Sequence, residues 1–271
     1  MVNPKISVIT PTKNEEKNIQ RLLKSLKKQT FQDFEIIVVD NFSKDKTLEI
    51  ASKFTKKIFQ AGRERSSQRN FGIKKAEGKY ILFLDADMIL EPDVLSQCYQ
   101  LMENDKNLAG VIIDEKSVGN NFLAKIKALE KEIYYGSEEI EAARFFRKSD
   151  FEKIGGYDES LIAGEDWDLS QRMRKLGLLG KISAKIHHYE DQSLINDIKK
   201  KYYYALHIKK YALKHPNYFQ KQVGFINRLQ ILFRKPRLIL AHPTEFLGLI
   251  LLKFSQYLAY ILSKLNPRVL D

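Results

Sequence analysis

The sequence predicts an α/β fold with a mostly parallel central sheet and helices on both faces. Strand and helix patterns alternate over the first 190 or so residues, and such alternation is typical of parallel strands joined by crossover helices. Two runs, Phe34–Asp40 and Tyr80–Leu84, are almost uninterruptedly apolar, as expected of strands that are buried on both faces. Ligands bind beyond the carboxyl ends of the strands in such sheets, so polar residues that follow a strand are the candidates for a site.

The individual elements follow from hydrophobic periodicity and from breakers. A first strand, Ile6–Thr10, precedes a helix from about Glu15 to Lys28 that carries its leucines on one face. Further strands are expected at residues 34–40, 57–59, 80–84, 108–113, 140–146 and 181–186, and further helices from near Asp45, Ser66, Pro92, Asn121 and Glu165. After about Gln192 the alternation ends in Lys-, Tyr- and Leu-rich helices interrupted by Pro216, Pro236 and Pro243. We therefore predict an α/β catalytic domain over residues 1–192 and a helical region over residues 193–271.

Composition narrows the class of protein. The chain has 271 residues, 44% of them hydrophobic and 30% charged, which indicates a globular protein with a substantial core. Its single cysteine, Cys98, excludes an intramolecular disulfide and lies in an apolar helical pattern, so it is expected in the core rather than as a nucleophile. The run Ile6–Thr10 is too short for a signal-peptide core. We expect a cytoplasmic protein.

The net charge of +12 is concentrated between Ile195 and Leu240. This stretch contains many lysines and arginines but one acidic residue, Asp197. A basic block of this kind suits an anionic partner such as nucleic acid, phospholipid or lipid phosphate. A solvated lysine-rich surface is the alternative.

The motif Asp85-Ala86-Asp87 directly follows the apolar strand Tyr80–Leu84. Two carboxylates at the mouth of a ligand cleft suit a divalent cation that bridges two phosphates, because Mg²⁺ or Mn²⁺ takes one or two protein carboxylates and fills its shell with phosphate oxygens and water. An isolated Asp-x-Asp also occurs by chance, so the preceding buried strand is what favours a functional site.

Asp40 ends the other central strand, and a carboxylate there can accept hydrogen bonds from a nucleobase or ribose. The alternative is that Asp40 only forms a turn. Arg63, Arg65 and Arg69 precede the strand that leads to Asp85, and guanidinium groups suit a diphosphate, although exposed arginines are common.

The segment Gly164-Glu165-Asp166-Trp167-Asp168 opens a helix after a glycine-bearing loop. Carboxylates at a helix N-terminus are favoured by the helix dipole, which is the structural explanation. The functional explanation is that Glu165 or Asp166 acts as a general base while its neighbours bind the acceptor. Asp168 can pair with Arg172 one turn later, and Trp167 could support a sugar ring or simply fill the core.

His187 and His188 end the last expected strand, and alternation places them on opposite faces, so at most one points into the cleft. An imidazole beside Asp87 would favour Mn²⁺ over Mg²⁺.

Together these motifs resemble the family 2 glycosyltransferases of the GT-A fold, of a membrane-associated type. The matching segments lie in order over about residues 4–190: Ile9–Glu15, Val38–Asp40 with Ser43 and Asp45, Arg69–Gly72, Asp85–Asp87 and Gly164–Leu169. Asn41 and Phe42 depart from the family's pattern, in which smaller polar residues are common.

The resemblance implies a role for each matching position. Asp40 and the stretch Thr10, Pro11 and Thr12, with Glu15 in the same motif, would bind the nucleotide. Asp85 would lie near the ribose, Asp87 would ligate the metal, Asp166 would be the base, and His188 matches a histidine that is a metal ligand in several relatives. The implied reaction is inverting transfer of a sugar from a UDP- or GDP-sugar to an acceptor hydroxyl.

Three alternatives stay open at this point. A polyprenyl-phosphate acceptor would already be anionic and would need no base, so the Glu165-Asp166 pair favours a hydroxyl acceptor. A sugar nucleotidyltransferase would be favoured by a glycine-rich loop near the N-terminus, and Thr10–Glu15 contains no glycine. A module that binds nucleic acid would leave the Asp85 and Asp87 pair unexplained, because carboxylates repel phosphate unless a metal intervenes.

The C-terminal region predicts a monotopic membrane anchor. Residues 246–262 are strongly apolar but interrupted by Lys253, Ser255 and Gln256, so they fall short of the about twenty mostly apolar residues that a spanning helix needs. Upstream, residues 225–237 alternate apolar side chains with Arg228, Arg234, Lys235 and Arg237, as expected of helices that lie on an anionic membrane. We therefore expect a peripheral protein at the cytoplasmic face of a membrane, with a lipid-linked or glycan acceptor and without a nucleic-acid partner. Packing of these helices on the catalytic domain or in a dimer is the alternative.

Overall fold

The computed structural model describes residues 3–190 and 193–264. They form two compact units that are interleaved in the sequence. The first unit takes in the chain as far as Glu115 together with Ala142–Glu159 and Asp168–His188, and the second takes in Lys116–Glu141, Ser160–Trp167 and the chain from Tyr189 onward. The sequence pattern instead predicts one boundary near Gln192, a residue that lies outside the described part of the chain.

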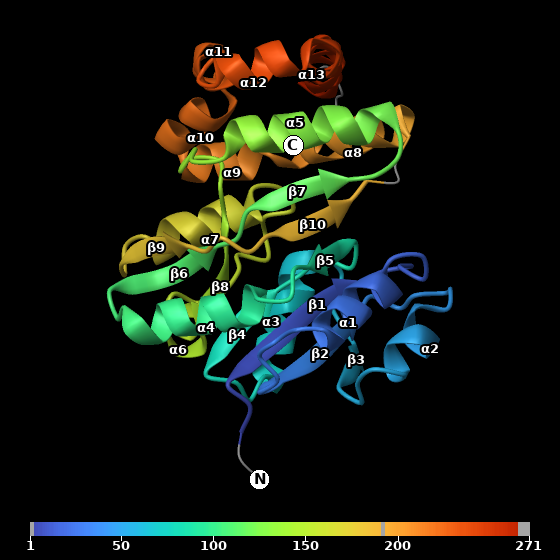
Figure 1. Cartoon of the computed structure of the whole chain (residues 1–271), viewed down its shortest axis with the longest axis vertical. Helices are drawn as coiled ribbons and strands as arrows, with labels where there is room; N and C mark the ends of the chain where they lie inside the picture. The colour runs from blue at the N-terminus through green and yellow to red at the C-terminus, as the bar shows by residue number, and fades with distance from the viewer. Residues whose placement is uncertain (1–2, 191–192, 265–271) are drawn as a thin grey trace. The chain divides into compact units, whose positions relative to one another are not determined.

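The first unit contains a seven-stranded sheet in the order β3-β2-β1-β4-β8-β6-β9. Its strands are β1 (Ile6–Thr12), β2 (Phe34–Asp40), β3 (Ile58–Gln60), β4 (Tyr80–Phe83), β6 (Leu108–Ile112), β8 (Ala143–Arg147) and β9 (Leu178–Lys181). The central strands β1, β2 and β4 are parallel (Figure 1), whereas β8 runs antiparallel between β4 and β6. The predicted α/β class with a mostly parallel sheet is confirmed.

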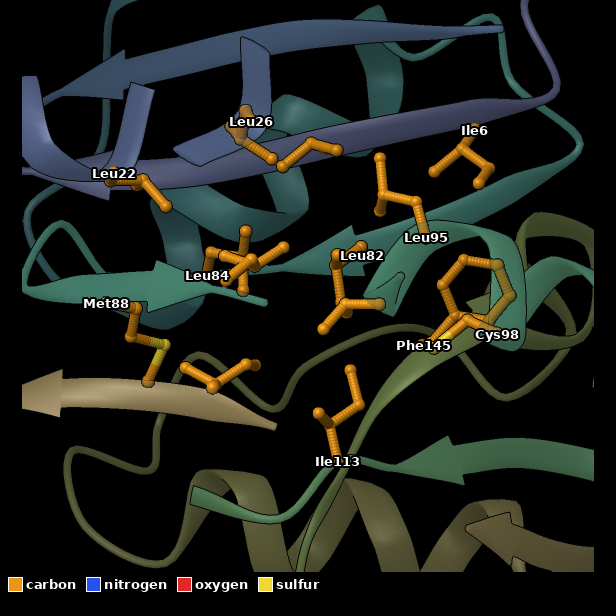
Figure 2. Close-up of a cluster of buried hydrophobic side chains, with 14 of the residues drawn as sticks. Ile6, Leu22, Leu26, Leu82, Leu84, Met88, Leu95, Cys98, Ile113 and Phe145 are labelled. Atoms are coloured by element: carbon orange, nitrogen blue, oxygen red, sulfur yellow. The ribbon is translucent and has the colours of Figure 1, made fainter. Parts of the chain in front are cut away.

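Helices cover both faces of this sheet because its strands are apolar on both sides. One core contains side chains of α1 (Ile19–Lys27), α2 (Thr47–Ser52) and α4 (Val94–Asn104), including Cys98, and Figure 2 shows Leu22, Leu95 and Cys98 gathered over the strands. The other core contains α3 (Arg65–Lys75), α6 (Lys148–Lys153) and the later part of α7 (Glu165–Met173). Cys98 is completely buried and burial raises the pKa of its thiol, as expected of a core residue.

One predicted strand is wrong. Residues 182–185 do not form a strand; they connect β9, which ends at Lys181, to β10 (Ile186–Tyr189). A short strand β5 (Met88–Leu90) was not predicted, and it pairs antiparallel with β10 so that His188 lies opposite Met88. The segment that was expected to be a strand supplies Ile182 and Ala184 to the core from an irregular conformation.

The second unit is helical. It contains α5 (Phe122–Tyr134), α8 (Leu194–His207), α9 (Lys209–Lys214), α10 (Pro216–Val223), α11 (Phe225–Leu232), α12 (Pro236–Ala241) and α13 (Pro243–Lys264), and β7 (Glu115–Val118) leads into it. Each of the three prolines predicted to interrupt this region opens a helix, where a fixed φ is favourable and no N–H partner is needed. Helix α13 packs on α5 and α8. Apolar side chains of α5, α11 and α13 form a separate core.

The length expected for the last helix was also wrong. Helix α13 has 22 residues, and its part Pro243–Leu262 is long and apolar enough to cross a membrane by length and composition alone. Length therefore does not decide between a helix that crosses a membrane and one that packs on other helices.

Candidate active site

The carboxyl ends of β1 and β2 are joined by a carboxylate. Thr12 lies opposite Asp40 in the parallel register, and its hydroxyl donates to Asp40 Oδ1 over 2.9 Å. The backbone N–H of Ser43 donates to Asp40 Oδ2 over 2.7 Å, and the Ser43 hydroxyl donates to Oδ1. Asp40 is completely buried. Its carboxylate therefore holds the end of β1 and the loop after β2 in one arrangement.

The loops after β1 and β2 are strained and joined to each other. Asn14 and Phe42 have φ of 55° and 49°, which side-chain-bearing residues rarely adopt. Asn14 N–H donates to the Ser43 hydroxyl over 2.7 Å, and Lys44 N–H donates to the Asn14 side chain over 2.9 Å. The Phe42 ring is 62% exposed at this edge. Strained residues that neighbouring hydrogen bonds hold in place are typical of ligand-binding loops.

The other residues predicted to bind the nucleotide lie at the same edge with different exposure. Thr10, Pro11 and Thr12 are buried, and among the described residues Thr10 Oγ1 has no hydrogen-bond partner. Glu15 is half-buried and accepts from Asn18, and the Arg63 side chain is exposed.

Asp85 follows β4 and is surrounded by arginines. Arg69, which is fully buried on α3, donates from Nη2 to Asp85 Oδ1 over 2.8 Å, and Arg144 Nη1 of β8 lies 3.9 Å from Oδ2. Burial alone would raise the pKa of Asp85, but Arg69, Arg144 and Arg65 outweigh it and hold the pKa well below its usual range. Asp85 is therefore a fixed anion.

Two residues in this region, Arg144 and Gln68, were not predicted as site residues. Arg144 also pairs with Glu115, with its Nε 2.8 Å from Glu115 Oε1. Gln68 donates to the carbonyls of Thr12 and Val39 and so ties α3 to the ends of β1 and β2. Only the pairing of β8 with β4 brings Arg144 to Asp85, and no local sequence pattern indicates that pairing.

Asp87 and His188, the two predicted metal ligands, lie together. His188 Nε2 is 3.0 Å from Asp87 Oδ2. Because β5 begins directly after Asp87 and pairs with β10, the register places His188 beside this carboxylate. The second carboxylate oxygen, Asp87 Oδ1, is buried without a hydrogen-bond partner among the described residues.

The neighbouring histidine points elsewhere. His187 Nε2 lies 3.1 Å from Glu91 Oε1, as expected if adjacent residues of a strand face opposite sides. Of the two histidines left open by the sequence, the geometry favours His188.

The pair fits a divalent cation of the Mg²⁺ or Mn²⁺ type. A buried carboxylate oxygen without a partner costs free energy unless a cation or donor satisfies it. Within residues 3–190 and 193–264 no group of three or more His, Cys, Asp or Glu side chains could hold a metal. Asp87 and His188 would therefore supply two ligands, which leaves the rest of the shell to diphosphate and water.

The acidic segment at the start of α7 divides between the two units. Glu165, Asp166 and Trp167 belong to the second unit, whereas Asp168 belongs to the first. Asp168 is completely buried, and its Oδ2 is 2.7 Å from Arg172 Nη2, so the predicted pair forms. This position suits a structural role better than contact with an acceptor. Glu165 is buried and Asp166 is half-buried.

Within the second unit, the loop before α7 packs on helix α9. Gly164 has φ of 79°, and a Cβ there would lie 2.6 Å from Tyr211 Cγ, so only glycine fits. The Trp167 ring lies 5.7 Å from the Tyr211 ring, and its indole N–H donates to Ile140 O over 2.8 Å. Tyr211 is therefore a support of this segment that the sequence did not indicate.

The comparison with known families identifies the class of protein. Residues 7–157 match the family described as Glycosyl transferase family 2, and the chain belongs to this family. It is 30% identical over 249 residues to the uncharacterized glycosyltransferase MJ1057 of Methanocaldococcus jannaschii, covering 83% of this chain and 85% of that one. It is also 40% identical over 100 residues to the poly(ribitol-phosphate) beta-N-acetylglucosaminyltransferase TarS of Staphylococcus aureus, covering 34% of this chain and 18% of that protein.

Solved structures confirm the GT-A fold. TarS residues 1–349 in complex with UDP-GlcNAc align with a TM-score of 0.58 at 21% identity, covering 94% of this chain and 88% of that one. The mannosyltransferase PcManGT from Pyrobaculum calidifontis, in complex with GDP-Man and Mn²⁺, aligns with a TM-score of 0.61 at 17% identity, covering 100% of this chain and 86% of that one. The chain is thus a glycosyltransferase of the GT-A fold.

Proposed function

We propose that this glycosyltransferase is metal-dependent and inverting, and that it moves a sugar from a UDP- or GDP-sugar to a hydroxyl of a lipid-linked or membrane-proximal glycan. The observation that carries the proposal is the pair Asp87 and His188 at the carboxyl edge of the sheet, with Asp87 Oδ1 left without a partner among the described residues. Solved relatives that bind UDP-GlcNAc or GDP-Man with Mn²⁺ support a nucleotide-sugar donor.

Several residues of the first unit would together bind the metal and the nucleotide part of the donor. Asp87 and His188 would hold Mn²⁺ or Mg²⁺, which when bound supplies positive charge to the departing diphosphate. The loops after β1 and β2, fixed by Asp40 and Ser43, would receive the nucleoside. Asp85, held by Arg69 and kept anionic, would accept hydrogen bonds from the ribose.

The transfer step needs a base for a hydroxyl acceptor. We assign this role to Asp166, with Glu165 and Trp167 orienting the acceptor. As the acceptor oxygen attacks the anomeric carbon and the bond to the diphosphate breaks, Asp166 takes the hydroxyl proton. Attack opposite the leaving group converts an α-linked donor into a β-linked product.

A panel of nucleotide sugars tests this proposal. In the presence of Mn²⁺ we expect the full chain to transfer the sugar from one UDP- or GDP-sugar, or to hydrolyse that donor slowly. This activity should be lost with EDTA. Undiminished activity in EDTA would overturn the metal role, and a product with retained anomeric configuration by NMR would overturn the inverting mechanism. Transfer to a polyprenyl phosphate instead of a hydroxyl would favour the phosphate acceptor.

A further inference from the structure

Helix α13 carries apolar side chains on its outer face as well as on the face that packs into the second unit. Eight of them are each between 38% and 63% exposed and recur at the spacing of one helical face: Leu247, Ile250, Leu251, Phe254, Tyr257, Leu258, Ile261 and Leu262. A surface helix of a soluble protein typically carries polar and charged side chains on its outer face. An exposed apolar face of this length marks a surface that meets a partner or a membrane.

Two polar side chains in the middle of the same helix, Lys253 and Gln256, are paired with residues of neighbouring helices. Lys253 forms an ion pair with Glu130 of α5. Gln256 Nε2 donates to Asp197 Oδ2 of α8 over 2.9 Å, and Asp197, which is 2% exposed, also lies 2.6 Å from Lys127 Nζ. Rotation of α13 to bury its outer face would leave Glu130 and Asp197 with fewer partners at a large cost. These contacts therefore keep the apolar face outward.

We propose that the outward face of α13 docks on an anionic lipid bilayer, with the helix lying along the membrane surface. The charges around the helix complement such a membrane. Lys199 and Lys200 of α8 and Arg237 of α12 are exposed on helices that pack on α13. Between residues 193 and 264 only Asp197 and Glu245 are acidic, so little repels anionic headgroups, which attract each nearby Lys or Arg.

The apolar surface extends beyond α13 itself. Phe233 is 59% exposed, and its ring lies 6.1 Å from that of Phe246 at the start of α13. Leu240 of α12 is 79% exposed. A broad apolar surface flanked by cations is expected of helices that lie in the membrane–water interface.

The inward contacts also decide between a helix that lies on the membrane and one that spans it. Spanning would separate Lys253 from Glu130 and Gln256 from Asp197 and carry a lysine into the hydrocarbon core, which is costly. A helix that lies flat keeps both contacts and immerses only the outer face. This inference deepens the proposed function by naming its membrane partner, and it relies on that proposal only for the location of the acceptor.

Flotation of the full chain with vesicles tests the inference. The wild type should float with vesicles of phosphatidylcholine and phosphatidylglycerol. The variant Leu251→Asp/Phe254→Asp should bind these vesicles at least about tenfold more weakly, because two negative charges enter the apolar face. The matched control is Leu178→Asp/Leu213→Asp, since both leucines are exposed apolar residues outside α13. We expect this control to float like the wild type. Circular dichroism should show that both variants fold.

Four outcomes would overturn the inference. The first is a wild type that stays in the soluble fraction. The second is binding of Leu251→Asp/Phe254→Asp equal to that of the wild type. The third is a wild-type dimer by light scattering that becomes a monomer in this variant without a change in flotation, which would assign the face to a second copy. Extraction at alkaline pH should release the protein. Retention in the vesicles would be a fourth contrary outcome, because it would indicate a spanning helix instead of one that lies along the surface. Nucleotide affinity is measured on the same samples, so failure of docking is distinguished from failure of the proposed function.

Discussion

His188 Nε2 and Asp87 Oδ2 lie 3.0 Å apart although they come from distant parts of the chain. The contact arises because β5, which starts at Met88, pairs with β10 in a register that places His188 opposite Met88. A carboxylate and an imidazole thus converge next to the ends of the central parallel strands. Such a mixed ligand pair suits Mn²⁺ better than Mg²⁺, and the first two predictions test the pair.

Asp87→Ala should abolish both transfer and the metal-dependent part of nucleotide binding while the fold survives. The physical reason is that the variant removes one of the two side chains that would hold the cation, which would supply positive charge to the diphosphate. Calorimetric titration with UDP and GDP, with and without Mn²⁺, measures the effect. The matched control is Glu91→Ala, which removes the nearby carboxylate that pairs with His187 and should leave the Mn²⁺ dependence intact. Equal Mn²⁺ dependence in Asp87→Ala and the wild type would contradict the assignment of Asp87 as a metal ligand.

His188→Ala should weaken Mn²⁺ affinity by at least about tenfold, because loss of even an outer-shell partner of a metal ligand costs about that much, whereas His187→Ala should not. The two residues are neighbours in β10 but face Asp87 and Glu91 respectively. Electron paramagnetic resonance of bound Mn²⁺ in the presence of nucleotide reports affinity and geometry directly. The reverse result, with loss only in His187→Ala, would show that the strand presents the other imidazole to the metal.

The sequence predicted the fold, and it placed the candidate site residues at the ends of strands, where the structure also has Asp40 and Asp85. Buried strands such as Phe34–Asp40 have a local signature, and the observed β2 has these same bounds. The short strands β5 and β10 and the antiparallel pairing of β8 depend on contacts between distant segments, so local periodicity does not reveal them. For the same reason Arg144 was missed, and the inward pairing of Lys253, which sets the orientation of α13, could not be foreseen.

Asp166→Asn should keep donor binding and lower turnover by roughly two to four orders of magnitude, the range of general base catalysis. Steady-state kinetics with saturating donor separates the two effects. Asp168→Asn is the contrasting variant, because it breaks a buried pair with Arg172 and should instead lower the free energy of unfolding by about 3 kcal/mol. A near-normal turnover in Asp166→Asn would contradict the hydroxyl acceptor and favour a phosphate acceptor, which needs no base.

The ion pair that orients α13 should make the stability of the protein depend on acid. Burial alone would raise the pKa of Glu130, but Lys253 and other nearby cations lower it from 4.5 to about 2 in the folded state. The stabilising contribution is therefore complete above about pH 5 and is lost as the pH falls towards 2, because the unfolded chain takes up the proton first. The shift corresponds to about 3 kcal/mol at neutral pH.

Urea unfolding of wild type and Glu130→Gln at a series of pH values measures this contribution. The variant should be less stable than the wild type at pH 7, and the difference should shrink progressively below about pH 4.5 as the Glu130 carboxylate loses its advantage in the folded state. Glu132→Gln is the matched control, because Glu132 is an exposed residue of the same helix and should show no such convergence. A difference between wild type and Glu130→Gln that stays constant from pH 7 to pH 3 would mean that Glu130 contributes through packing rather than charge. The pair with Lys253 would then not be what holds the apolar face of α13 outward.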